Sequence, residues 1–247
     1  MRLTLRVWRQ AGPAESGRYR DYEVDDARPE MSVLDLLDLL NAGLIDAGAE
    51  PVAFDSDCRE GICGACGVTV DGRPHGPTDN TPSCRQRLAS FSDGDTVRIE
   101  PLRATAFPVI RDLVVERAAL DEVARAGAHV SVPTGAAPDA DTTLQGHDAA
   151  EAALDLAACI GCGACVASCP NGSANLYVGA TLAHLTLMPF SDLERGPRAR
   201  EMVRAADVEF GPCSLYGECA RVCPAGIPLR AVGAVNRERL RSVFRRS

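Results

Sequence analysis

The first hundred residues carry short runs of alternating apolar and polar positions, which is the pattern of half-buried β-strands. Leu3, Leu5 and Val7 alternate in this way, and residues 19–24 can return as the hairpin partner of that strand. Ser32, with an acidic residue three positions later, then forms a capping-box-like start for a helix. The apolar positions of this helix recur at helical spacing: Val33, Leu36, Leu37, Leu40 and Leu44.

A second group of strand signals follows a cysteine-rich loop. Val68 and Val70 lead into Asp71-Gly72, which is a tight-turn signal, and residues 96–100 offer a closing strand. Two hairpins, a crossing helix and the loop between them predict a β-grasp domain.

Around residues 104–108 the strand signals end and helical periodicity begins. The apolar positions spaced for one buried helical face are Ile110, Leu113, Val114, Leu120 and Val123. This change predicts an α+β chain, with a β-grasp domain at residues 1–106 and an all-α domain at residues 107–247. Residues 131–146, rich in Pro, Gly, Ala and Asp, are expected to form a surface connection.

Two further helices are predicted in the second half. Residues 176–190 form the most apolar stretch, but it is short and interrupted by His184 and Pro189, so we expect a buried helix rather than a membrane span. Residues 229–244 are predicted to form the last helix. The residues expected to face inward on it are Val232, Leu240 and Val243. The N-terminus lacks the apolar core of a signal peptide, which predicts a soluble chain in a reducing cytoplasm.

Composition narrows the classes of function. The chain has 247 residues, with 26 Lys plus Arg against 34 Asp plus Glu and a net charge of -8. This balance argues against broad nucleic-acid binding through phosphate contacts. Because the 11 cysteines are an odd number and no secretory signal precedes them, a disulfide framework explains them poorly.

The cysteines lie in three compact arrays. The second array, Cys159, Cys162, Cys165 and Cys169 followed by proline, reads C-x2-C-x2-C-x3-C-P. This is the spacing of bacterial ferredoxins that hold cubic iron–sulfur clusters, in which the fourth cysteine ligates the other cluster of a pair. A second run of cysteines is therefore required.

A third array supplies that run with one cysteine missing. Cys213, Cys219 and Cys223 repeat the spacing once Tyr216 stands where the second cysteine would be. The crossed-ligand rule then predicts a [4Fe-4S] cluster and a [3Fe-4S] cluster. The predicted ligands of the first are Cys159, Cys162, Cys165 and Cys223, and those of the second are Cys169, Cys213 and Cys219. We expect Tyr216 to fill the vacant corner, and ligation of a fourth iron by its phenolate is the rival interpretation.

The first array has a different spacing. Cys58, Cys63 and Cys66 give C-x4-C-x2-C, and Cys84 follows at a distance, which is the plant-type [2Fe-2S] arrangement. Interleaved glycines let the loop take left-handed turns and bring backbone N–H groups close to the sulfur atoms. All 11 cysteines are thus predicted to bind clusters, and no residue is predicted to be catalytic.

Structural zinc is the alternative for any closely spaced cysteine pair. Such zinc sites usually take two separated ligand pairs. Four cysteines within 11 residues, repeated downstream with one defect, fit cluster binding better than tetrahedral zinc.

Four stretches of the chain resemble the motifs of one family, the iron–sulfur subunits of succinate dehydrogenase and fumarate reductase. They are SDCREGICGACG at 56–67, FPVIRDLVV at 107–115, CIGCGACVASCPNGSA at 159–174 and CSLYGECARVCP at 213–224. The resemblance spans nearly the whole chain, and the missing cysteine of the third array is its most specific feature.

The resemblance implies an electron-transfer subunit. In this family a flavoprotein subunit with covalent FAD oxidises succinate, and electrons pass through the three clusters to quinone at a membrane anchor. The succinate-oxidising site is then expected on another subunit. The chain is expected on the cytoplasmic face of the bacterial membrane, held there by anchor subunits.

One stretch departs from the better-known members. They carry tryptophans after the second array and a histidine beside the first [3Fe-4S] ligand of the third, and these help form the quinone pocket. Here NGSA stands at 171–174 and Ser214 follows Cys213. NGSA resembles the shorter branch of the family, whose anchors commonly contain haem. The resemblance therefore gives no quinone-contact residue in this chain.

Other functions remain open at the level of sequence. Quinol:fumarate reductase uses the same parts in the reverse direction, and the sequence does not separate the two. A non-catalytic iron–sulfur sensor would need a DNA-binding or signalling module, which the sequence does not reveal. Among isolated residues, Arg59 is a candidate contact to the flavoprotein, and His75, His147 and His184 are expected to be hydrogen-bonded histidines at helix surfaces.

Overall fold

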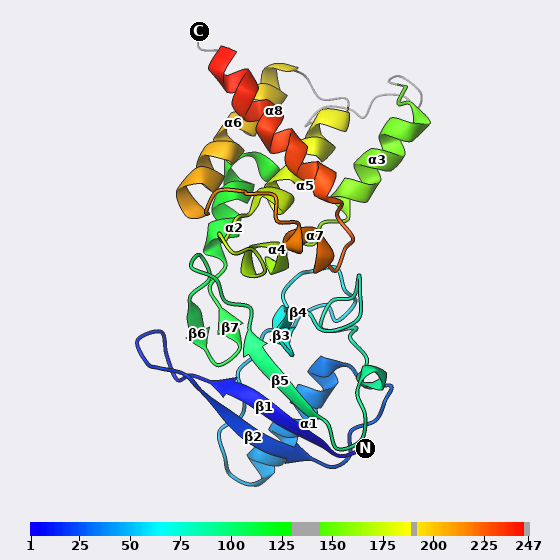
Figure 1. The fold of residues 1–247 in the computed structure, drawn as a ribbon, viewed down its shortest axis with the longest axis vertical. Coiled ribbons are helices and arrows are strands. Elements are labelled where there is room, and N and C mark those ends of the chain that lie inside the picture. The colour runs from blue at the N-terminus through cyan, green and yellow to red at the C-terminus, as the bar shows by residue number, and fades with distance from the viewer. Residues whose placement is uncertain (130–143, 189–191, 245–247) are drawn as a thin grey trace, which may run out of the picture.

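The computed structural model of the protein describes residues 1–129, 144–188 and 192–244. A β-sheet with one long helix forms one end of the molecule, and a group of helices forms the other (Figure 1). The N-terminus lies in the sheet, and the last helix lies at the far end. The fold is therefore a mixed α/β one, with the sheet in the N-terminal half.

The elements of the first half run to residue 115. They are β1 (Leu3–Arg9), β2 (Arg18–Val24), α1 (Val33–Asp46), β3 (Val68–Val70), β4 (Arg73–Pro74), the 3-10 turn η1 (Leu88–Ser90), β5 (Thr96–Pro101), β6 (Val109–Arg111) and β7 (Val114–Val115).

The second half contains helices. They are α2 (Ala118–Val123), its π-helical continuation η2 (Ala124–Ala128), α3 (His147–Ala157), α4 (Ala164–Ala167), α5 (Asn175–Leu187), α6 (Asp192–Glu209), α7 (Glu218–Arg221), the 3-10 turn η3 (Leu229–Ala231) and α8 (Val232–Phe244).

The five-stranded sheet has the order β2-β1-β5-β3-β4. β1 pairs antiparallel with β2 and parallel with β5, while β3 pairs antiparallel with both β4 and β5. The predicted hairpin of β1 and β2 is confirmed. The predicted turn is confirmed as well, because Asp71 and Gly72 both have positive φ, 49° and 79°, as a two-residue hairpin of this kind requires.

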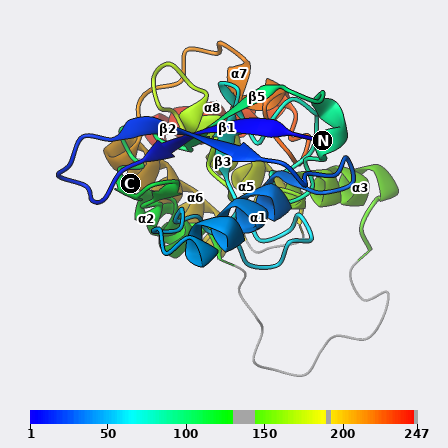
Figure 2. The ribbon, with the colours of Figure 1, turned by 90° about the horizontal axis from the view of Figure 1, so that it is seen from below.

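Helix α1 lies against one face of this sheet, as the view from below shows (Figure 2). Its predicted capping box is present: Ser32 Oγ accepts from the backbone of Asp35, whose carboxylate accepts from the backbone of Ser32. The buried face of the helix packs against the inward side chains of β1 and β5. This first core contains Leu3, Leu5, Val7, Leu36, Leu37, Leu40, Val97 and Ile99.

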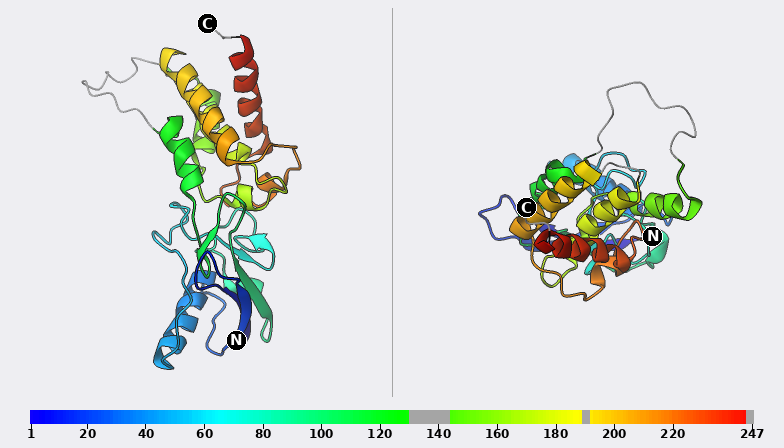
Figure 3. Two further views of the ribbon diagram at one scale, coloured as in Figure 1. Left: turned by 90° about the vertical axis from the view of Figure 1, so that its left-hand side faces the viewer. Right: turned by 90° about the horizontal axis from the view of Figure 1, so that it is seen from above.

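The second core is built around α5, which contacts α3, α6 and α8. The apolar stretch that the sequence marked is thus a buried helix, as predicted, with Leu176, Val178 and Leu182 almost fully buried. No helix in the described parts of the chain is both long and apolar enough to cross a membrane. The side view on the left of Figure 3 shows the helical half stacked on the sheet half along the long axis.

The helical periodicity predicted after residue 108 is wrong for its first part. Residues 109–115 form the antiparallel β6–β7 hairpin, and helix begins only at Ala118. β-Branched residues fill these strands and favour extended backbone, and Asp112 turns the chain with φ 45°. Ile110, expected in the buried face, is 42% exposed.

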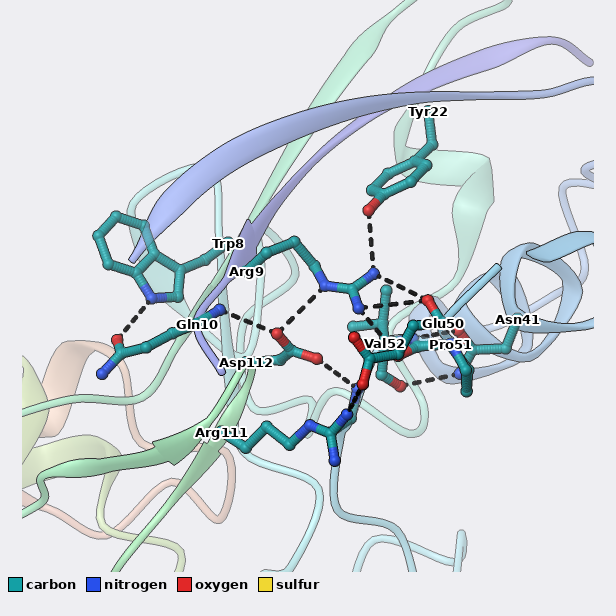
Figure 4. A network of polar contacts seen from close by, with 11 residues as sticks. Trp8, Arg9, Gln10, Tyr22, Asn41, Glu50, Pro51, Val52, Arg111 and Asp112 are labelled. Atoms are coloured by element: carbon teal, nitrogen blue, oxygen red, sulfur yellow. Dashed lines mark hydrogen bonds and ion pairs between the residues drawn. The ribbon is translucent and has the colours of Figure 1, made fainter. Parts of the chain in front are cut away.

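The hairpin links the two cores. Val109 and Val115 belong to the second core, whereas Leu113 near the turn belongs to the first. Beside it, Asp112 is buried and accepts hydrogen bonds from Arg9, from the backbone of Gln10 and from the backbone of Ala53 (Figure 4). The turn is thus fixed to the end of β1.

Two other predictions have different outcomes. Leu240, expected to face inward from the last helix, is 63% exposed, because the buried face of α8 runs through Val232, Val235 and Glu238 instead. The predicted surface connection falls mostly on residues 130–143, which lie outside the described residues.

Candidate functional site

The first cysteine array is carried by two loops of the sheet half. Cys58, Cys63 and Cys66 lie between α1 and β3, and Cys84 comes from the segment before η1. Cys66 and Cys84 are buried together against Leu34, while Cys63 is exposed. The structure therefore brings the distant fourth cysteine to the loop of the other three.

Backbone N–H groups of this loop are directed at its sulfur atoms. Glu60 N donates to Cys58 Sγ at 3.3 Å, and Ala65 N donates to Cys63 Sγ at 3.4 Å. Positive φ at Gly61 and Gly64 makes this wrapping possible. Hydrogen bonds from the backbone of Ile62 and Glu60 lower the pKa of Cys58 to about 7, so this thiol ionises near neutrality.

A cavity in the helical half gathers cysteines from the second and third arrays. Its walls include Cys159, Cys162, Cys165 and, from the third array, Cys223. Burial raises the pKa of Cys162 to about 12 and the pKa of Cys165 well above its usual value. These thiols ionise only with a positive partner close by.

A second cavity gathers the remaining three cysteines. Cys169, Cys213 and Cys219 line it, with Ser214, Leu215 and Tyr216 also on its walls. Tyr216 is 62% exposed, and it stands on the cavity wall where the spacing of the second array would put a cysteine. Burial also raises the pKa of Cys219.

The sequence repeat has a counterpart in the backbone. Gly163 in the second array and Gly217 in the third both have left-handed φ, 85° and 88°, and each begins a helix of one turn, α4 and α7. These two helices contact each other. The third array therefore repeats the backbone of the second even though one cysteine is replaced by tyrosine.

The donor set fits iron–sulfur clusters. Thiolate sulfur is their usual ligand, and the two cavities present four and three cysteines. Because burial disfavours the thiolate of Cys162 and Cys165, iron would offset a penalty that the protein alone leaves uncompensated. Within the described residues no three His, Cys, Asp or Glu side chains lie close enough together to bind a single metal ion, and the cysteines of each cavity surround a larger space instead.

The backbone of the first array contacts the backbone of the second. A Cβ on Gly64 would overlap the carbonyl oxygen of Ile160 and would lie 3.1 Å from Cys162 N. Arg117, at the start of α2, donates through Nη1 to Gly64 O at 2.5 Å and to Cys162 O at 3.4 Å. No local sequence pattern points to Arg117, because 53 and 45 residues separate it from these partners.

His75 lies close to this junction and corrects an expectation. It is not at a helix surface: it follows β4 with φ 68° and is buried, with Nδ1 3.0 Å from Ser83 Oγ. Its Nε2 has no hydrogen-bond partner among the described residues. Burial, assisted by the charge of Arg117, lowers the pKa of His75 to about 4, so the ring is neutral at pH 7.

Of the other isolated candidates, His184 is hydrogen-bonded as expected, while the contact of Arg59 to a flavoprotein stays a prediction. His184 is partly buried on α5, with Nδ1 2.8 Å from the carbonyl oxygen of Ala153. Arg59 pairs with Asp38 at 2.5 Å and Asp35 at 3.5 Å and remains partly exposed beside the first array.

Comparison with protein families finds two matches. Residues 4–122 match the family described as a 2Fe-2S iron-sulfur cluster binding domain, and residues 158–227 match the family described as a 4Fe-4S dicluster domain. The first match contains the first array, and the second match contains the other two.

Similar proteins match over most of the chain. The fumarate reductase iron-sulfur subunit of Mycobacterium tuberculosis is 31% identical over 97% of this chain and 92% of its own length. The succinate dehydrogenase iron-sulfur subunit of Bacillus subtilis is 26% identical over 88% of this chain and 85% of its own length.

A solved structure shares the fold. A chain of the Mycobacterium smegmatis Sdh1 complex in the apo form aligns with a TM-score of 0.69, over 99% of this chain and 97% of that chain, at 24% identity. The likeness therefore extends over both halves, in the same order along the chain.

Proposed function

The chain belongs to the family of iron–sulfur subunits of succinate dehydrogenase and fumarate reductase, and from that premise we propose that it is the electron-transfer subunit of a succinate:quinone oxidoreductase. Its first half is then a β-grasp ferredoxin domain, residues 1–106, and its second half a ferredoxin-like domain, residues 107–247, which is helical after the β6–β7 hairpin rather than all-α. Electron transfer is the chemistry that clusters supply when they are bound.

One observation carries the proposal. Two neighbouring arrays exchange a cysteine: Cys223 of the third lines the cavity of the second, and Cys169 of the second lines the cavity of the third. Such an exchange is the arrangement of two-cluster ferredoxins.

The proposed ligands of the first cluster come from the cysteine loops of the sheet half, and those of the other two come from these two cavities. We propose that Cys58, Cys63, Cys66 and Cys84 hold a [2Fe-2S] cluster. The cavity with four cysteines would hold [4Fe-4S], through Cys159, Cys162, Cys165 and Cys223. The cavity with three, Cys169, Cys213 and Cys219, would hold [3Fe-4S]. The position of Tyr216 on the wall of the last cavity supports a site with three thiolates.

The protein's own residues then have separable tasks. Backbone N–H groups of Glu60 and Ala65 stabilise negative charge on sulfur at the first array. Burial excludes water from the second array, and Gly163 and Gly217 let the backbone wrap closely around each cavity. The succinate-oxidising chemistry belongs, in this proposal, to a flavoprotein subunit with FAD.

Partners and location are part of the proposal. A membrane anchor subunit, with haem where it follows the shorter branch, would pass electrons to the quinone pool and hold this chain at the cytoplasmic face of the membrane. The names of the relatives support such a complex, since each is called a subunit.

Quinol:fumarate reductase is the second candidate. It is favoured by the relative at 31% identity, which carries that name. Relative rates of succinate oxidation and fumarate reduction by the assembled complex distinguish the two, and a strong bias to fumarate reduction would replace the first proposal by the second.

Low-temperature electron paramagnetic resonance (EPR) tests the cluster assignment. Anaerobically purified protein should show a [3Fe-4S] signal when oxidised and a [2Fe-2S] signal on reduction. Stoichiometric zinc without acid-labile sulfide would refute the proposal.

A further inference from the structure

Arg117 occupies the junction of the first and second arrays. It is the residue before α2, and its Nη1 donates to Gly64 O at 2.5 Å and to Cys162 O at 3.4 Å. Gly64 follows Cys63 directly, and Cys162 is itself a proposed ligand. One side chain therefore connects a loop of the [2Fe-2S] site with a ligand of the [4Fe-4S] site.

Arg117 has no ion-pair partner among the residues that the structure describes. Its hydrogen-bond partners among the described residues are these two carbonyl oxygens, and neither is a carboxylate. The side chain is partly buried, so water screens it less than it screens the paired surface arginines. The guanidinium lies against the backbone of both arrays, within hydrogen-bond distance of Gly64 O and Cys162 O. After burial, its charge is also a cause of the lowered pKa of His75, which lies close to this junction.

The backbones of the two arrays are closely packed at this junction. Gly64 packs against Ile160 O and Cys162 N, and a Cβ on Gly67 would lie 3.7 Å from Cys162 O. A change in the position of Arg117 would therefore alter a hydrogen bond to each of the two arrays.

We propose, on the basis of the proposed function, that Arg117 is a positioning residue that fixes the first and second arrays to each other and uses its unpaired charge to hold the reduction potentials of both clusters higher. Each cluster becomes more negative by one charge when it accepts an electron, and a fixed cation nearby stabilises that form. In the transfer itself, one site loses one electron and the other gains it. Arg117 is neither oxidised nor reduced and forms no covalent bond.

The test is an anaerobic redox titration of the full chain in its assembled complex, followed by low-temperature EPR. The variants are Arg117→Gln, which removes the charge but keeps a donor, and Arg117→Lys, which keeps a charge on a shorter side chain without the planar fork. The control is Arg125→Gln, which removes the same charge from a side chain that is 65% exposed and paired with Glu122.

We expect Arg117→Gln to shift the [2Fe-2S] and [4Fe-4S] potentials to more negative values, and Arg117→Lys to shift both in the same direction by less. The [3Fe-4S] potential should change least, and Arg125→Gln should change none of them. A purely structural role for Arg117 would lower cluster content without this common shift.

Unchanged [2Fe-2S] and [4Fe-4S] potentials in both variants, at full iron and sulfide content, would overturn the inference and leave the proposed function intact. If Arg117→Gln does not retain its clusters, Arg117→Lys decides by the same criterion. Absence of the expected signals from the unaltered chain would instead refute the proposed function itself.

Discussion

Gly64 in the first cysteine loop packs directly against the carbonyl oxygen of Ile160 in the second, with no room between them for a Cβ atom. Gly64 also has a left-handed backbone, φ 71°. Both features require glycine, and both lie where the two arrays meet. The contact explains why this position of the loop tolerates no side chain.

Replacing Gly64 by alanine should therefore destabilise the protein in two ways. The left-handed backbone costs about 1 kcal/mol with a side chain, and overlap with Ile160 O adds roughly 1–3 kcal/mol. Gly48→Ala is the matched control, because Gly48 has φ 66° and open space around it. Anaerobic thermal unfolding should show a clearly larger loss for Gly64→Ala, and equal losses would contradict the contact.

The buried ion pair of Asp112 leads to a second prediction, a difference in stability between a buried and an exposed variant. It accepts from Arg9 Nε at 3.1 Å and from the backbone of Gln10 and Ala53, each at 2.9 Å (Figure 4). Asp112→Asn keeps the shape and tolerates positive φ, but it leaves the nearly buried Arg9 without its counter-charge. Because breaking a buried pair is costly, we expect a loss of about 3 kcal/mol in the free energy of unfolding.

The control for Asp112 is Asp21→Asn. Asp21 also pairs with an arginine, Arg6, at 2.8 Å, but both side chains are about half exposed. Exposed pairs of this kind contribute little. Denaturant unfolding should therefore show little change for Asp21→Asn, and a comparable loss for the two variants would rule out burial as the cause.

The sequence predicted elements whose determinants are local. The capping box of α1 and the Asp71-Gly72 turn each lie within four residues of chain, and the cysteine arrays are themselves local spacings. The β6–β7 hairpin was missed because Ile110, Leu113 and Val114 fit helical spacing equally well. The β-branched residues of the two strands favour extended backbone, and hydrogen bonds from Gln10 N and Ala53 N, 102 and 59 residues away, hold Asp112 at the turn.

A long-range contact also explains one unpredicted part of the site. Nothing local shows that Arg117 reaches Gly64, 53 residues away. His75 was missed for another reason: it is buried beside Ser83, eight residues further along, whereas the sequence predicted a histidine at a helix surface. The exposure of Leu240 has a different, local cause: Glu238 occupies the inward position on α8 and pairs with Arg241, three residues away.

His75 predicts a dependence of stability on pH. Its pKa falls from 6.5 to about 4 on folding, because burial and the facing charge of Arg117 disfavour the imidazolium. The unfolded chain therefore binds the proton more readily, so the stabilisation is complete above pH 6.5 and is lost as pH falls toward 4. Between pH 7 and pH 5 the loss from this group should be about 2 kcal/mol.

The variant His75→Asn checks this assignment. Asparagine does not titrate, retains a hydrogen-bonding group near Ser83 and accepts positive φ. Thermal unfolding from pH 7 to pH 5 should show a flatter profile for His75→Asn than for the unaltered chain. Parallel profiles would mean that another group accounts for the acid sensitivity.

Removal of iron should reveal a difference in thiol reactivity between the arrays. The pKa of Cys58 is lowered to about 7, whereas the pKa of the buried Cys162 is raised to about 12. Because the thiolate is the nucleophile, Cys58 should be alkylated by iodoacetamide at pH 7 well before Cys162. Peptide mass spectrometry of the cluster-free chain measures both in one sample, and equal rates would show that the arrays do not keep their geometry without iron.

Tyr216 offers the sharpest test of the third array. The residue lies on the wall of the cavity with Cys169, Cys213 and Cys219 and is 62% exposed, so its replacement disturbs little packing. Tyr216→Cys supplies a fourth thiolate and should convert the proposed [3Fe-4S] cluster to [4Fe-4S], with loss of the EPR signal of the oxidised protein.

The control Tyr216→Phe separates this prediction from ligation of a fourth iron by the phenolate. Phenylalanine removes the oxygen and keeps the ring, so the oxidised-state signal should persist unchanged if three thiolates hold the cluster. If the phenolate were a ligand, the EPR spectrum of Tyr216→Phe would differ from that of the unaltered protein. A spectrum that stays the same in Tyr216→Cys would contradict the assignment of the vacant corner to this position, because the added thiol would then lie out of reach of the cluster.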